Sequence, residues 1–94
     1  MFIYIIGNNT NKQKIGFSNN VNKRLKTLQT GNPDQLYIHH YELVPDDRVR
    51  LLEHKLHKEL NHMRIKGEWF DMSPSDAKLM LQFLMIRWLD DLTL

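Results

Sequence analysis

The chain has 94 residues, of which 41% are hydrophobic and 26% charged, and it contains no cysteine. We expect one compact domain over residues 1–94, and the lack of cysteine excludes disulfide scaffolds, thiolate metal sites and cysteine nucleophiles. The formal net charge is only +2, yet the first 33 residues hold five basic residues and no acidic one. The N-terminal third is therefore where a polyanion would dock, although the charge alone favours chance clustering of solvated lysines. We expect a cytoplasmic protein with neither signal peptide nor membrane anchor.

The first half of the chain predicts a hairpin, a helix and a further strand. Residues 2–6 are β-branched and aromatic, and residues 12–17 become extended again after a polar turn, as in a β-hairpin. Ser18 or Asn19 would cap the next helix, and Gly31 with Pro33 would end it. Residues 36–43 are typical of a third strand.

Two more helices are expected in the second half. Asp46 or Asp47 would cap a helix that runs to about Met63, and Ser73 would cap another that continues to about Asp91. The order of these elements predicts a small α/β or α+β domain, and we expect an α+β fold: a small three-stranded, largely antiparallel sheet flanked by three helices.

The last helix is apolar on two sides. One side carries residues suited to packing on a core, namely Ala77, Met80, Leu81, Leu84 and Trp88. The roughly opposite side carries Leu79, Phe83, Ile86 and Leu89. Two interpretations remain open: this second side forms a homodimer interface, or the helix is sandwiched inside one chain.

Glu53 is a candidate site residue because helical spacing places it beside an apolar stripe rather than on the solvent face. A carboxylate in that position needs a cation, a hydrogen-bonding cluster or a metal ion. His57 follows four residues later and shares this face. Arg24 flanks the apolar face of the first helix and could present its guanidinium to a phosphate, or lay its stem over the core. For Glu53, the alternative to a functional role is a structural ion pair with a nearby lysine or arginine.

The five histidines suggest a metal site only weakly. A zinc site would need His54, His57 or His62 to converge, but their spacing does not match the metalloprotease pattern. His39 and His40 are adjacent in a presumed strand and would face opposite sides of the sheet.

Six short motifs occur in order over residues 2–71. They are Tyr4-Ile5, Lys14-Ile15-Gly16, Arg24-Leu25, Leu52-Glu53, Leu56-His57 and Gly67-Glu68-Trp69-Phe70. In this order the chain resembles the GIY-YIG endonuclease superfamily, and most closely its small phage-type branch.

This resemblance implies metal-dependent hydrolysis of DNA phosphodiester bonds by a stand-alone endonuclease or nickase of low intrinsic sequence specificity. By the same resemblance Glu53 would bind Mg²⁺ or Mn²⁺, Tyr4 would orient or deprotonate the attacking water, and Arg24 would neutralise the phosphate. Lys14 and His57 complete the expected catalytic set. Phosphate contacts are expected from the basic N-terminal third, through Lys12, Lys23 and Lys26. The alternative is a non-catalytic nucleic-acid-binding or protein-interaction module with the same fold.

Overall fold

The structure is a computed structural model that describes residues 1–93, with side chains described through Trp88. Its strands are β1 (Phe2–Gly7), β2 (Lys12–Ser18), β3 (Tyr37–Leu43), β4 (Arg64–Lys66) and β5 (Trp69–Asp71). Its α-helices are α1 (Val21–Gln29), α2 (Val49–Glu59) and α3 (Pro74–Thr93), and short 3₁₀ turns at Asp46–Arg48 and Asn61–Met63 flank α2. The five strands form one sheet in the order β3-β1-β2-β5-β4, and each neighbouring pair is antiparallel.

The prediction of a three-stranded sheet is therefore wrong. The missing strands, β4 and β5, have three residues each and are joined by a turn at Gly67, whose φ is +57°. Strands this short show no readable alternation of polar and apolar residues, and the positive φ is a conformation that glycine adopts at little cost. They exist as strands because β5 pairs with Lys12 to Lys14 of β2.

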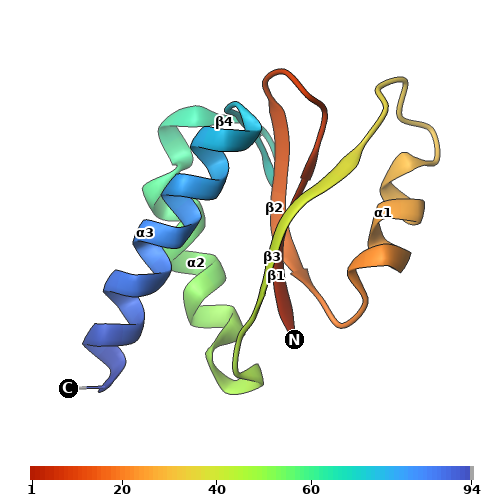
Figure 1. Ribbon diagram of the computed structural model, residues 1–94. Coiled ribbons are helices and arrows are strands. Elements are labelled where there is room, and N and C mark those ends of the chain that lie inside the picture. Colours follow the sequence, from red (N-terminus) through yellow and green to blue (C-terminus); the bar gives the residue numbers. More distant parts are fainter. Residues whose placement is uncertain (94) are drawn as a thin grey trace.

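The sheet lies between two helical layers, with α1 on one face and α2 and α3 on the other (Figure 1). Alternation along β1 explains both layers, because successive side chains of a strand point to opposite faces. Ile3 and Ile5 pack in the core beneath α2 and α3, whereas Tyr4 and Ile6 pack on the α1 side. A strand buried on both faces reads as a continuous apolar run, which is what residues 2–6 show.

The helix starts differ from the expected ones in two of three cases. Asn20, rather than Ser18 or Asn19, caps α1, since its side-chain oxygen accepts from the Lys23 amide at 3.0 Å. α2 begins after the 3₁₀ turn with no side-chain cap, so neither Asp46 nor Asp47 plays that role. The expected cap of α3 is confirmed, because the Asp76 amide donates to Ser73 Oγ at 3.1 Å.

α3 buries one face only. The expected core face is confirmed by the burial of Ala77, Leu81, Leu84 and Trp88, with Met80 partly buried. The opposite side chains of Leu79, Phe83 and Ile86 remain 66%, 64% and 65% exposed. Within the described part of the chain this excludes the sandwiched arrangement, while the Leu89 side chain lies outside the described residues. No helix among the described residues is both long and apolar enough to span a bilayer.

Candidate functional site at the free edge of β2

The C-terminal half of β2, from Gly16 to Ser18, lies at an edge of the sheet. β5 pairs with β2 only as far as Lys14, and the last backbone link is the Ile15 amide, which donates to the Glu68 carbonyl at 3.3 Å. In the described structure no strand pairs with Gly16 to Ser18 on this side. Side chains from the α1 face and from the α2 face can therefore meet around this edge.

Gly16 lies next to side chains of the site. Tyr4 is its partner in the β1–β2 ladder, and a Cβ added to Gly16 would lie 2.7 Å from Tyr4 Oη and 3.2 Å from Glu68 Oε2. The tyrosine hydroxyl and the glutamate carboxylate thus both lie against the Gly16 backbone. The need for glycine here is one of space, since the positive-φ glycines are Gly31 and Gly67.

Tyr4 is 1% exposed, and burial is the main reason that its pKa is raised to about 12. Arg24 opposes this rise of the pKa, and the carboxylates of Glu68 and Glu53 add to it. One hydroxyl is thus within electrostatic reach of a guanidinium from α1, a carboxylate from the β4–β5 turn and a carboxylate from α2. The phenol is neutral at physiological pH and can donate a hydrogen bond.

Lys14 and Glu68 form an ion pair beside this hydroxyl. The Lys14 Nζ atom lies 3.2 Å from Glu68 Oε2 and 5.7 Å from the centre of the Trp69 ring. The ammonium is mostly buried while the carboxylate is partly exposed. Lys14 is therefore held between an anion and an aromatic face, close to where Tyr4 meets Gly16.

Three side chains at this edge can supply metal ligands. One ligand atom each from Glu53, His57 and Glu68 lies within 4.8 Å of the others. His57 Nε2 lies 3.2 Å from the Ile15 carbonyl, so in the tautomer that donates this bond the other ring nitrogen is free to accept. The His57 ring also packs on Phe70 at 5.6 Å. Two carboxylates and one imidazole are a donor set that fits a divalent ion.

The structure brings Tyr4, Lys14, Glu53 and His57 to one edge. Arg24 reaches this edge from α1 closely enough for its charge to oppose the rise that burial causes in the pKa of Tyr4. Arg24 itself is exposed, and with Lys23 it lines a hollow of about 410 Å³ at the start of α1. Lys12, Lys23 and Lys26 are exposed.

Sequence reasoning missed Glu68 as a site residue. It lies in the motif Gly67-Glu68-Trp69-Phe70, which was recognised only as a motif, so a signal was present in the sequence. Of the three histidines considered for a zinc site, only His57 belongs to a ligand cluster among the described residues, and His54 and His62 are exposed.

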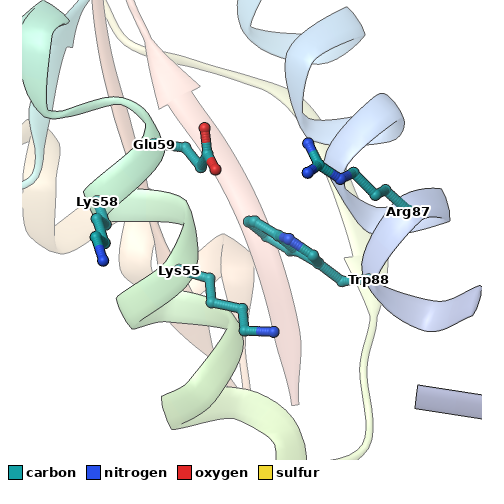
Figure 2. A pocket seen from close by; sticks show the side chains of 5 residues that line it. All are labelled: Lys55, Lys58, Glu59, Arg87 and Trp88. Atoms are coloured by element: carbon teal, nitrogen blue, oxygen red, sulfur yellow. The ribbon is translucent and has the colours of Figure 1, made fainter. Parts of the chain in front are cut away.

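A second hollow, of about 480 Å³, lies between α2 and α3, away from these residues. Figure 2 shows Trp88 in its middle, with the Glu59 carboxylate and the Arg87 guanidinium turned toward each other above the ring and the Lys55 chain below it. It contains none of the residues gathered at the β2 edge. Its lining has one carboxylate and no histidine, so it offers no comparable set of metal ligands.

The fold and the edge cluster define a small layered α+β domain in which a tyrosine, two cations and three potential metal ligands meet. The chain belongs to the T5orf172 domain family, whose family model matches residues 1–85, and this is a phage-type, nuclease-related domain. Neither the curated proteins nor the solved structures gave a match.

This match corrects the assignment drawn from the motifs. The family model that matches is that of the T5orf172 domain and not a GIY-YIG model. Order and spacing of short motifs do not distinguish families whose domains share such elements, because each motif has only two to four residues. The roles of the site residues therefore have to be argued from their geometry in this chain.

Proposed function

We propose that this chain hydrolyses phosphodiester bonds of DNA with the help of a divalent ion, Mg²⁺ or Mn²⁺, held through Glu53. The observation that carries the proposal is the meeting of the Tyr4 hydroxyl, the Lys14 and Arg24 cations and the Glu53–His57–Glu68 cluster at one exposed sheet edge. Membership in a nuclease-related family also supports a function that acts on DNA.

Charge placement is the main contribution of the protein to such a reaction. Phosphoryl transfer gathers negative charge on the phosphate oxygens, and positive groups fixed nearby lower its barrier. Arg24 would bind a phosphate oxygen through its planar fork, and Lys14 would add a second positive charge. A divalent ion, when bound, supplies further positive charge to the scissile phosphate and the departing oxygen.

The Tyr4 hydroxyl would act as a hydrogen-bond donor. With a pKa of about 12 it keeps its proton at neutral pH, so it is suited to orienting a water or a phosphate oxygen and not to removing a proton. The proton lost by the attacking water can pass to a carboxylate oxygen of the cluster. Of the two roles expected for Tyr4, we therefore propose that of orienting the water.

DNA would be bound through its phosphates. The N-terminal third holds all five of its charged residues as cations, and Lys12, Lys23 and Lys26 are exposed. Contacts of this kind hold the backbone of DNA without reading its bases, which accounts for low intrinsic sequence specificity.

The alternative is a non-catalytic module that binds nucleic acid or protein. Such a module needs the exposed lysines, but it has no use for a hydroxyl whose pKa is raised by burial and by two nearby carboxylates. The edge cluster is the specific observation that favours hydrolysis over this alternative.

The test is relaxation of supercoiled plasmid DNA in Mg²⁺ or Mn²⁺. Glu53→Gln should lower the rate by about 100-fold or more, because it removes a charge that acts on the reacting centre. Glu59→Gln is the matched control, because Glu59 is an exposed glutamate of the same helix. This variant should cleave DNA at the wild-type rate. Circular dichroism checks that both variants are folded. Cleavage by Glu53→Gln at the wild-type rate, or equal wild-type cleavage in excess chelator, would refute the proposal.

A further inference from the structure

We propose that Glu53, His57 and Glu68 together form a mixed nitrogen–oxygen site that prefers a first-row transition ion such as Mn²⁺ over Mg²⁺, and that the ion takes the place of the Lys14 ammonium on Glu68. This inference deepens the proposed function, on which it rests, by naming the complete ligand set and the ion class. Lys14 thereby becomes free to contact a phosphate only when the ion is bound.

The first support is the separation of the ligand atoms. Ligands of one divalent ion lie about 2.1 Å from it and so at most about 4.2 Å from each other. The ligand atoms of the three side chains already lie within 4.8 Å of one another. The three residues are half-buried, and small torsional changes in the two glutamates close the difference. The site therefore needs little rearrangement of the backbone.

The second support is the hydrogen bond that His57 makes. A metal-binding histidine usually donates its other ring N–H to a carbonyl or carboxylate, which fixes both the tautomer and the ring orientation. His57 Nε2 has the Ile15 carbonyl at 3.2 Å, and Phe70 packs against the ring. Ile15 can offer this carbonyl because β5 does not extend past Lys14. The sheet edge thus fixes the orientation of the imidazole beside the two carboxylates.

The donor types decide between ions. Mg²⁺ demands oxygen ligands, whereas imidazole binds first-row transition ions well, and carboxylates accept Mn²⁺. A set of two carboxylates and one imidazole consequently gives Mn²⁺ one good ligand that Mg²⁺ uses poorly. The expected preference comes from His57.

The third support is the ion pair of Glu68. Lys14 Nζ lies 3.2 Å from Glu68 Oε2, so a cation already occupies the side of this carboxylate that faces β2. A divalent ion bound to the same carboxylate would repel the ammonium. Binding of a divalent ion should therefore loosen Lys14 from Glu68, and the Trp69 ring 5.7 Å from the ammonium should report the change.

The experiment measures ion binding without DNA. Chelator-treated protein is titrated with MnCl₂ and, separately, with MgCl₂. Free Mn²⁺ is followed by electron paramagnetic resonance, Mg²⁺ by calorimetry, and tryptophan fluorescence is recorded in both. We expect one Mn²⁺ per chain, bound at least about tenfold more tightly than Mg²⁺, with a change in fluorescence.

Three variants identify the ligands. His57→Gln should weaken Mn²⁺ binding by about tenfold or more and leave Mg²⁺ binding within about twofold. The matched control is His54→Gln, an exposed histidine of the same helix, which should bind both ions as the wild type does. Lys14→Gln should bind Mn²⁺ more tightly than the wild type, because the competing cation is gone.

Equal affinities for the two ions, or an unchanged Mn²⁺ affinity in His57→Gln, would overturn this inference. A Mn²⁺ affinity that does not rise in Lys14→Gln would overturn the exchange at Glu68. None of these results would touch the proposed hydrolysis, which fails only if DNA cleavage is independent of Glu53 or of divalent ions.

Discussion

The Tyr4 hydroxyl lies so close to the Gly16 backbone that a single methyl group on Gly16 would come within 2.7 Å of it. The two residues are partners across the β1–β2 ladder, and Glu68 lies against the same glycine. Gly16 thus makes room for the tyrosine of the site at the place where β2 loses its second neighbour.

Gly16→Ala should therefore destabilise the fold and damage the site together. Overpacking of this kind costs about 1–3 kcal/mol of unfolding free energy, measured by urea denaturation. Tyr4→Phe removes the atom in closest conflict, so Gly16→Ala should cost less in a Tyr4→Phe background. Equal costs in the two backgrounds would show that the Tyr4 hydroxyl is not what the alanine meets.

The stability of the protein should fall as the pH rises from about 10 to about 12. The pKa of Tyr4 is near 10 in an unfolded chain and about 12 in the folded one, so between these values the unfolded state loses its proton first. The stability contributed by the neutral phenol is complete below pH 10 and about 2–3 kcal/mol smaller once the pH has passed the folded-state pKa. Urea unfolding at pH 9 and pH 11 should show a smaller loss in Tyr4→Phe than in the wild type. Identical losses would contradict the raised pKa.

DNA affinity should depend steeply on salt. Lys23→Glu and Lys26→Glu should weaken binding to all sequences alike and reduce the slope of log K against log salt by about one each, since each variant would lose a proposed phosphate contact. Lys78→Glu on α3 serves as the control with the same charge change at an exposed position in the opposite layer. Fluorescence anisotropy with labelled duplexes measures all of these values. Binding that does not respond to salt would argue against a phosphate-contacting surface.

The exposed side of α3 remains the expected homodimer interface. Leu79, Phe83 and Ile86 follow one another at helical spacing on the outer layer, and an uncovered apolar stripe of this kind is typical of an interface. Because Phe83 is 64% exposed, Phe83→Glu should leave the domain folded and yield a monomer, while the wild type dimerises. Light scattering over a range of protein concentrations tests this. A wild-type chain that stays monomeric at high concentration would end the dimer hypothesis.

Local patterns were sufficient for the elements that are long or carry strong end signals. The hairpin, the strand over 36–43 and the three helices all appear close to their expected positions. Ser73 caps α3 as expected because its signal, a serine followed by Pro74 at the first helical position, depends on neighbouring residues alone. The cap of α1 was misplaced by one or two residues, since three polar residues in a row offer equivalent oxygens.

The individual site residues were also accessible from the sequence. Glu53 was singled out because a carboxylate beside an apolar stripe needs a partner, and His57 because it follows by one helical turn. Both conclusions depend only on positions within one helix. What they could not supply was the third member of the cluster, Glu68, which comes from a different element.

Only the tertiary structure decided how far β5 pairs along β2, and this extent of pairing brings the site residues together. Residues 64–71 have no pattern strong enough to define strands, and their pairing is a long-range interaction whose register depends on the packing of the whole sheet. Because the pairing stops at Lys14, the Ile15 carbonyl is left for His57, Glu68 reaches Gly16, and side chains from both faces of the sheet meet at one edge. The sequence by itself determined which residues could do chemistry, and the sheet edge determined which of them come together.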